Sequence, residues 1–300
     1  MRNIIKIFRN MFKDELNIKK IDVDLPIIYN IAKRAGFKLT RNEKNDNEYL
    51  RVVERKTQVV VLSTTQKKVK RAKFACLSDI HAGAKGIDIN KLKAFLNKCK
   101  KVKIRYLFIA GDLFEGCNMF ANHENILEEN TPEGQARILF NELKDYNFHV
   151  IFINGNHDYS FETNHQANPN RILADMLMNA KKKVSYIDSF YGDAVIENIG
   201  IRLVHLDDSY ANTREYPCVK YAKEQINARD YTQNPDTGEM YKLHVVISGH
   251  IHRHEIYQYK EVLVFQPGSI KEKDLDQEKR IGFIVRITVE GEILKEYNIS

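Results

Sequence analysis

The chain has 300 residues, of which 43% are hydrophobic and 29% are charged, a composition typical of a globular protein with a sizeable core. No run approaches the roughly 18 apolar residues that a membrane span needs, and the N-terminus lacks the small-residue cleavage site of a secretory signal. Four widely spaced cysteines without a CxxC pair argue against a disulfide framework and a thiolate zinc site, so a reducing cytoplasm is the expected compartment.

The charge is unevenly distributed along the chain. Residues 1–73 contain 19 basic and 8 acidic residues, a net charge of +11, whereas residues 74–300 contain 28 and 32, a net charge of −4. A basic segment beside a mildly acidic body fits a polyanionic partner such as nucleic acid or anionic lipid, and it fits a solvated lysine-rich surface equally well.

Residues 1–72 are expected to form a small basic α+β module. Apolar residues recur at helical spacing between Ile4 and Leu16, and Leu25–Gly36 is a second helix candidate. Glu48–Glu54 and Gln58–Ser63 are expected to pair as a basic-tipped hairpin. Two helices before such a hairpin resemble a winged-helix module, with residues 64–71 as the linker. The apolar stripe of the first helix is expected to pack on its own module, with a membrane surface or a partner as the alternative.

From Lys73 to the C-terminus, short apolar strands alternate with helices, which predicts a catalytic α/β domain over residues 73–300. The predicted helices are Asp88–Lys101, Pro132–Asp145 and Pro169–Lys182, with Thr131 and Asn168 as caps of the last two. The predicted strands are Lys73–Ser78, Arg105–Ala110, Phe148–Ile153, Val184–Ile187, Ala194–Glu197, Ile201–Leu206, Leu243–Ser248, Glu261–Phe265 and Ile281–Val289. The later strands have little helix between them and indicate a second, more antiparallel sheet. The expected architecture is a four-layer αββα sandwich.

Five short polar motifs follow these strands, mostly at their carboxyl ends. They are Asp79-Ile80-His81, Gly111-Asp112, Gly155-Asn156-His157-Asp158, His205 and Gly249-His250-Ile251-His252. Carboxylates and imidazoles at strand ends are what a metal site on an α/β scaffold requires. A lone histidine is more often a satisfied polar residue, and that is the expectation for His149, His165, His244 and His254.

The five motifs, in this order, resemble those of the calcineurin-like metallophosphoesterase superfamily, DxH, GD, GNH(D/E), H and GHxH. The resemblance covers residues 73–270 and implies two metal ions. Asp79, His81 and His252 would hold the first ion, Asn156, His205 and His250 the second, and Asp112 would bridge them. Two divalent ions about 4 Å apart can clamp an in-line phosphoryl displacement. Mn is favoured, and Fe, Zn or Co would also suit these donors.

The resemblance also implies two catalytic residues that are not metal ligands. His157 would contact the phosphate and protonate the leaving oxygen, and Asp158 would orient His157. The polar stretches Gly116–Asn130, which holds His123, and Ala211–Lys242 follow ligand positions and are expected to overhang the site and shape substrate choice.

The second motif lacks the Arg-Gly of protein Ser/Thr phosphatases, and His157 argues against the lipid A pathway pyrophosphatases, which carry arginine there. GDLFEG, GNHD and the turn Gln266-Pro267-Gly268-Ser269 are similar to the SbcD-type DNA repair nucleases. The segment Ser78-Asp79-Ile80-His81 is also similar to the polymerase D small-subunit exonucleases.

The leading hypothesis is therefore a nuclease that cuts phosphodiester bonds of nucleic acid, gripped through residues 1–72. The alternatives are a small-molecule enzyme such as a cyclic-nucleotide phosphodiesterase or phosphatase, and a non-enzymatic module with a vestigial site. SbcD-like nucleases work as dimers with an ATPase partner, so the resemblance raises a homodimer or an ATPase partner for this chain.

Overall fold

The computed structural model describes residues 15–17, 29, 37–44, 47–55, 58–64, 71–205, 231–271, 281–288 and 293–297. The chain divides into two compact units, Met1–Gln58 and Val59–Ser300. Within the described ranges, no helix is both long enough and apolar enough to cross a membrane. All five motifs lie in the larger unit.

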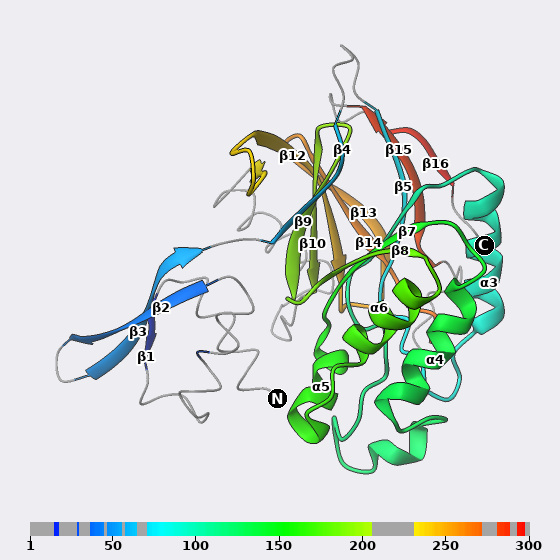
Figure 1. Ribbon diagram of the computed structural model, residues 1–300, viewed down its shortest axis with the longest axis horizontal. Helices are drawn as coiled ribbons and strands as arrows, with labels where there is room; N and C mark the ends of the chain where they lie inside the picture. Colours follow the sequence, from blue (N-terminus) through cyan, green and yellow to red (C-terminus); the bar gives the residue numbers. More distant parts are fainter. Residues whose placement is uncertain are drawn as a thin grey trace. The chain divides into compact units, whose positions relative to one another are not determined.

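The first sheet of the larger unit has six strands in the order β16-β15-β5-β6-β7-β8 (Figure 1). The strands β5 to β8 run parallel, and β15 and β16 extend the sheet with antiparallel pairing. Because parallel strands share one direction, the carboxyl ends of β5, β6 and β7 lie along the same edge. The strands span Arg71–Leu77 (β5), Tyr106–Ile109 (β6), His149–Ile153 (β7), Lys183–Ile187 (β8), Phe283–Thr288 (β15) and Ile293–Tyr297 (β16).

The second sheet has the strand order β13-β14-β12-β10-β9-β4, with the short β11 paired to β12. Here β10, β12 and β14 run parallel, so the motifs that follow β10 and β12 also share an edge. The strands span Val59–Ser63 (β4), Tyr191–Ile196 (β9), Ile199–His205 (β10), Tyr231–Gln233 (β11), Met240–Gly249 (β12), His254–Tyr259 (β13) and Val262–Pro267 (β14).

Two apolar cores hold these layers together. One lies between the first sheet and the helices α3 (Ile89–Lys101), α4 (Pro132–Leu143) and α6 (Pro169–Asn179), and the other lies between the two sheets (Figure 1). In the second core Phe74 meets Phe108 and Phe265 edge to face, with ring centroids 5.6 and 6.4 Å apart. The α/β class is confirmed, with helices and two sheets giving three of the four expected layers. Residues 206–230, which follow β10, lie outside the described residues.

The three predicted helices are confirmed together with their capping residues. The side chains of Thr131 and Asn168 accept hydrogen bonds from backbone N–H groups of α4 and α6, each helix having proline in its first turn. Asp88 caps α3 in the same way. A further helix, α5 (Asn156–His165), was not expected from the sequence.

The smaller unit contains a three-stranded antiparallel sheet in the order β1-β3-β2, spanning Glu15–Asn17, Asn47–Arg55 and Phe37–Lys44. The predicted helices within residues 4–16 and 25–36 lie outside the described residues, apart from strand residues 15–16 and the helical Tyr29.

The predicted basic hairpin is wrong. Strand β3 pairs with β2, whereas Val59–Ser63 (β4) runs parallel to β9 in the second sheet of the larger unit. There Val60 and Leu62 pack against the core between the sheets. A run of four apolar residues removes more apolar area from water at such a core than in an isolated hairpin, which favours this pairing.

Candidate metal centre

The motif residues converge where the carboxyl edges of the two sheets meet. Asp79 and His81 follow β5, Asp112 follows β6, and Asn156 begins α5 directly after β7. From the second sheet, His205 ends β10, and His250 and His252 follow β12. Backbone hydrogen bonds join the loops, because the N–H groups of Asp79 and His81 donate to the carbonyls of Gly111 and Asp112 at 3.1 Å.

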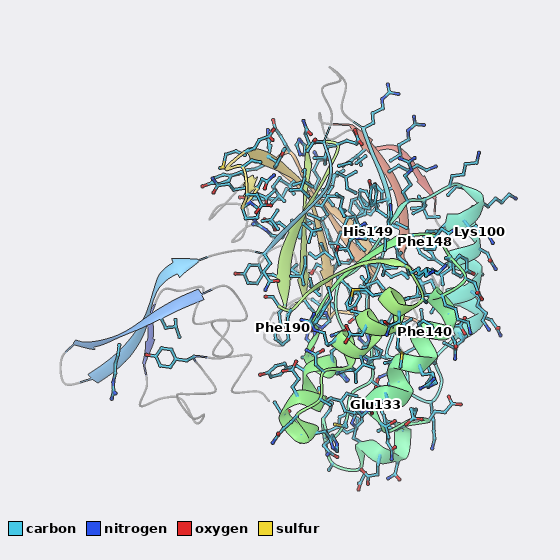
Figure 2. All side chains as sticks on the ribbon, viewed as in Figure 1. Lys100, Glu133, Phe140, Phe148, His149 and Phe190 are labelled. Carbon is cyan, nitrogen blue, oxygen red and sulfur yellow. The ribbon has the colours of Figure 1, made fainter. Side chains whose placement is uncertain are left out.

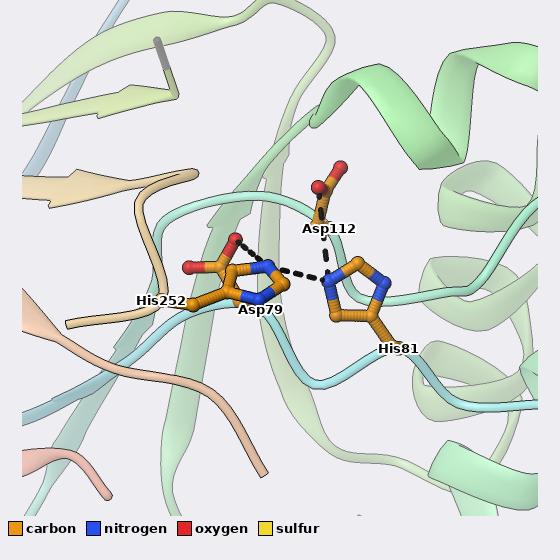
Figure 3. A group of neighbouring side chains, drawn as sticks. All are labelled: Asp79, His81, Asp112 and His252. Atoms are coloured by element: carbon orange, nitrogen blue, oxygen red, sulfur yellow. Dashed lines mark hydrogen bonds and ion pairs between the residues drawn. The ribbon is translucent and has the colours of Figure 1, made fainter. Parts of the chain in front are cut away.

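One group of ligand atoms comes from Asp79, His81, Asp112 and His252, whose donor atoms all lie within 4.8 Å of one another (Figure 3). The Nε2 atoms of His81 and His252 are 3.0 Å apart, and His252 Nε2 is 3.4 Å from Asp79 Oδ1. Two imidazole nitrogens and two carboxylates that converge in this way form a donor set suited to a divalent cation.

A second group comes from Asp112, His205 and His250, again within 4.8 Å. His205 Nε2 lies 3.1 Å from both Asp112 Oδ2 and Asn156 Oδ1, and His250 Nδ1 lies 3.0 Å from Asn156 Oδ1. The structure thus brings all seven predicted ligands together, with Asp112 common to both groups. A shared carboxylate between two donor sets is the arrangement that a binuclear centre requires.

A hydrogen bond to the far side of one ring and a close carboxylate on the far side of another set which nitrogen faces the centre. His205 Nδ1 donates to the carbonyl of Ala110 at 2.7 Å, which leaves the Nε2 lone pair for a metal. His81 Nδ1 lies 2.8 Å from Glu115 Oε2, so its Nε2 also faces the donor group. His244 contacts the Lys242 carbonyl near the start of β12 and belongs to neither group, as expected for a satisfied polar residue.

Five of the seven ligands have a left-handed backbone, which is uncommon for residues with a side chain. The φ angles are positive at Asp79, His81, Asp112, His250 and His252, between 48° and 87°. Each such residue costs of order 1–3 kcal/mol and persists only where the surrounding structure imposes it. The tight turns after β5, β6 and β12 therefore orient these side chains toward the centre at a cost in folding stability.

Close packing at the centre explains two of the motif glycines. A Cβ on Gly155 would overlap the backbone N and Oδ1 of Asp112, and a Cβ on Gly111 would overlap the imidazole of His205. Ser269, in the turn after β14, braces the first loop because its hydroxyl donates to the Asp79 carbonyl at 2.9 Å.

The electrostatics of the centre favour ionised carboxylates. Burial opposes ionisation of Asp112, but His205 and His157 hold its pKa well below the ordinary value, and His252 and His205 likewise lower the pKa of Asp79. Burial opposes protonation of His205, yet Asp112 raises its pKa to about 9. The buried carboxylates thus retain their charge beside the imidazoles of the centre.

His157 stands beside the metal-ligand groups without belonging to the two that share Asp112. Its Nδ1 donates to the Glu115 carbonyl at 2.6 Å and its N–H donates to Asp112 Oδ1 at 2.8 Å. Its ring meets the His81 ring edge to face, with centroids 4.6 Å apart. Because Nδ1 donates its proton to the Glu115 carbonyl, Nε2 is the ring nitrogen left for a substrate oxygen, and it can donate a proton when the ring is protonated on both nitrogens.

Asp158 does not orient His157, which corrects the role expected for it. Its carboxylate accepts the backbone N–H groups of Phe114 and Gly155, both at 2.8 Å, and so caps α5 and ties two motif loops together. Burial, with a further contribution from the nearby Asp112, raises the pKa of Asp158 to about 7. The Glu115 carbonyl takes the orienting role instead.

Glu115 is the functional residue that the sequence did not single out. Its fully buried carboxylate lies 2.8 Å from His81 Nδ1 and 3.1 Å from His123 Nε2, and it accepts Lys271 Nζ at 2.9 Å. His123 Nδ1 accepts the N–H of Met119, so His123 Nε2 is the atom that donates. The only sequence signal was an acidic residue directly after the apolar pair of the second motif.

The remaining unassigned histidines lie outside the ligand groups, as expected. His149 Nε2 contacts Ser185 Oγ at 2.8 Å, and His254 Nε2 donates to the Gly282 carbonyl at 2.9 Å. His165 is in the last turn of α5.

Comparison with solved structures finds distant likenesses. An archaeal phosphodiesterase is 15% identical with a TM-score of 0.44, covering 76% of this chain and all of that one. Vacuolar protein sorting 29 from Cryptosporidium parvum is 14% identical with a TM-score of 0.39, covering 77% of this chain and 99% of that one. The Entamoeba histolytica Vps29 is 16% identical with a TM-score of 0.37, covering 76% and 100%. Likenesses this distant assign no activity.

No curated protein sequence matches the chain. The family model of the calcineurin-like phosphoesterase superfamily domain matches residues 73–290, which contain every ligand described above. The chain belongs to the calcineurin-like phosphoesterase superfamily.

Proposed function

We propose that this protein is a two-metal phosphodiesterase that cuts nucleic acid. The observation that supports the chemistry is the pair of ligand groups that share Asp112, with His157 held beside them. Two bound divalent ions would activate the attacking water and neutralise the negative charge that builds up on the phosphoryl oxygens. We propose Mn for both positions, because mixed carboxylate, amide and imidazole donors suit it, as they also suit Fe, Zn and Co.

The residues of the chain have separate roles in this proposal. Asp112, whose buried carboxylate is common to both ligand groups, would contribute to holding both ions. His157, anchored through Nδ1 to the Glu115 carbonyl, presents Nε2 to the leaving oxygen and donates the proton that the departing alkoxide needs. Such a proton donor contributes typically 10²–10⁴-fold to the rate.

The nucleic-acid part of the proposal is supported by charge. The net charge of +11 over residues 1–73 is attached to a body whose net charge is −4. Lysine and arginine side chains that neutralise backbone phosphates supply most of the sequence-independent affinity for nucleic acid. We therefore propose that the N-terminal segment holds the polynucleotide that the metal centre cuts.

The test is a metal-dependent cleavage screen on the purified full chain with Mn present. Labelled DNA and RNA, a cyclic nucleotide and bis-p-nitrophenyl phosphate would be compared for the wild type, Asp112→Asn and His157→Ala. His149→Ala is the matched control, since His149 lies outside both ligand groups. We expect polynucleotide cleavage that Asp112→Asn and His157→Ala abolish and His149→Ala retains. Turnover of the small diesters alone would overturn the nucleic-acid assignment and favour a cyclic-nucleotide or similar small substrate.

The binding role of the N-terminal segment has its own test. Charge reversal at Arg55 and Lys56, combined with reversal of the basic residues of 67–71, should weaken polynucleotide binding and flatten its dependence on salt. Binding that keeps the wild-type affinity and salt dependence would remove the N-terminal segment from the proposal while leaving the metal centre in place.

A further inference from the structure

A cluster of exposed cations lies at the edge of the first sheet opposite the metal centre. The segments that lead into β6 and β8 contribute six exposed basic residues, which we call the basic edge: Lys100, Lys101, Lys103, Arg105, Lys181 and Lys183. The predicted metal ligands of the first sheet follow the carboxyl ends of β5, β6 and β7, whereas these residues precede or begin β6 and β8, which run parallel to them. In Figure 2, Lys100 and His149 lie above and to the right of Phe190, whose carbonyl accepts the N–H of His205.

Contacts between neighbouring loops join the basic edge into one surface. Strands β6, β7 and β8 are neighbours, with Tyr106 paired to His149 and His149 paired to Lys183. The Lys100 ammonium lies 6.0 Å from the centre of the Tyr146 ring, in the loop before β7. From the other side, Lys182 Nζ donates to Asn147 Oδ1 in the same loop at 3.3 Å. The cations of two helix ends thus approach each other across one short loop.

Among the described residues the basic edge makes no ion pairs, although the carboxylates of Glu142 and Asp145 lie near the Tyr146 ring that Lys100 covers. Within the described part of the chain none of its six members makes an ion pair, whereas other surface cations do, such as Lys93 with Glu142 at 3.5 Å. Two unit charges 10 Å apart in water repel by about 0.4 kcal/mol before salt screening. A row of unpaired cations therefore lowers the stability of the fold slightly. Stability does not explain why the cations are there, whereas a binding role would.

The backbone at the two helix ends adds a second cost to folding stability. Helices α3 and α6 end alike, with Lys103 and Lys181 at φ angles of 57° and 59° and with N–H groups that return to the last turn. This left-handed position usually holds glycine, and a lysine there costs roughly 1 kcal/mol more. Cations near a helix C-terminus gain from the helix dipole, but that gain fades beyond the last turn and does not extend to Arg105 or Lys183.

We propose that the basic edge is a binding site for the sugar–phosphate backbone of nucleic acid, separate from the metal centre. Neighbouring strands about 4.8 Å apart set the loops in a row, which suits a regularly charged backbone. Met178 is the exposed large hydrophobic residue near this row within the described ranges, so the surface offers charge rather than an apolar patch to a partner. The choice of nucleic acid as the polyanion rests on the proposed function.

The distance between the basic edge and the ligand loops indicates how the basic edge would act. Strands of four or five residues at about 3.3 Å per residue separate it from the ligand loops by roughly 15 Å. A polynucleotide held at the basic edge is therefore several nucleotides away from the bond that is cut, or belongs to a second duplex. The site would raise affinity for long substrates without changing the chemistry on small ones.

The test compares two variants with the same change in charge. Lys101→Glu/Lys183→Glu alters the basic edge, and Lys242→Glu/Lys260→Glu alters exposed lysines of the second sheet. Binding of a labelled duplex and of a labelled single strand would be measured in EDTA, so that cleavage plays no part. We expect the edge variant to bind at least about tenfold more weakly and to lower the salt slope by about two contacts, with the control near wild type. Thermal melting verifies that both variants are folded.

Two results would overturn the basic edge as a nucleic-acid site. One is an edge variant whose affinity and salt slope equal those of the control. The other comes from a parallel assay with anionic phospholipid vesicles. If the edge variant lost vesicle binding and kept nucleic-acid binding, the basic edge would be assigned to a membrane surface. Binding is measured without metal, so it does not depend on cleavage. If the protein cleaved no polynucleotide, the proposed function would be refuted, but the binding assay would still decide whether the basic edge binds nucleic acid.

Discussion

Replacement of Glu115 should weaken metal binding through its contact with the predicted ligand His81. Its carboxylate lies 2.8 Å from Nδ1 of the ligand His81 and also receives His123 and Lys271. In Glu115→Gln one oxygen becomes an NH₂ group, which would face at least one of three donors. His81 would then rotate or exchange the nitrogen that carries its proton, and its Nε2 lone pair would no longer be fixed toward Asp79 and His252.

The size of the effect follows from this geometry. Loss of a partner that orients a metal-bound histidine typically lowers metal affinity 10–100-fold, or about 1.4–2.7 kcal/mol. Breaking a buried charge pair also destabilises the fold, by about 3–5 kcal/mol. For Glu115→Gln we expect a loss of stability near the lower end of that range, because the Lys271 side chain is 19% exposed and can reach water. Affinity and stability must therefore be measured separately.

The assay would measure Mn binding by calorimetry and by competition with a chelator, together with thermal unfolding without metal. Asp193→Asn is the matched control, because Asp193 forms a buried bidentate pair with Arg202, at 2.8 and 2.9 Å, away from the ligand loops. We expect both variants to lose stability and only Glu115→Gln to lose metal affinity. Wild-type Mn affinity at both positions in Glu115→Gln would refute the orienting role, and an equal loss in Asp193→Asn would attribute the effect to general destabilisation.

Three further predictions follow from the packing and the chemistry of the site. Gly155→Ala should lower both metal affinity and stability by several kcal/mol, because the new Cβ would overlap Asp112; calorimetry and thermal melting that match wild type would contradict this. His157→Ala should slow cleavage of a nucleotide diester about 10²–10⁴-fold and a p-nitrophenyl ester much less, since only the poorer leaving group needs the proton; equal losses in kcat would count against the proton-donor role. Cys99 should resist thiol reagents at pH 8 until the protein unfolds, because burial raises the pKa of its thiol to about 12 and leaves little thiolate; rapid native-state labelling of Cys99, read by mass spectrometry, would show the packing to be wrong.

Local sequence patterns did not predict helix α5 or the pairing of the strand Val59–Ser63. Helix α5 was missed because its sequence, NHDYSFETNH, has too few apolar residues to mark one face, and its first turn is instead fixed by Asp158 and the loop of Phe114. The strand at Val59–Ser63 was expected, but its partner was not. That partner, β9, lies more than a hundred residues away, and short-range pattern alone favoured the neighbouring strand.

The sequence by itself determined the donor types, their order and their place at strand ends, because these depend on side-chain chemistry and on local strand patterns. All seven predicted ligands meet at the centre for that reason. Tertiary structure alone decided what surrounds them. Glu115 gains its role from His123 and Lys271, which arrive from distant loops, and Asp158 points to backbone N–H groups rather than to His157. The basic edge likewise exists because parallel strands bring separate helix ends together, a proximity that no local pattern of charges records.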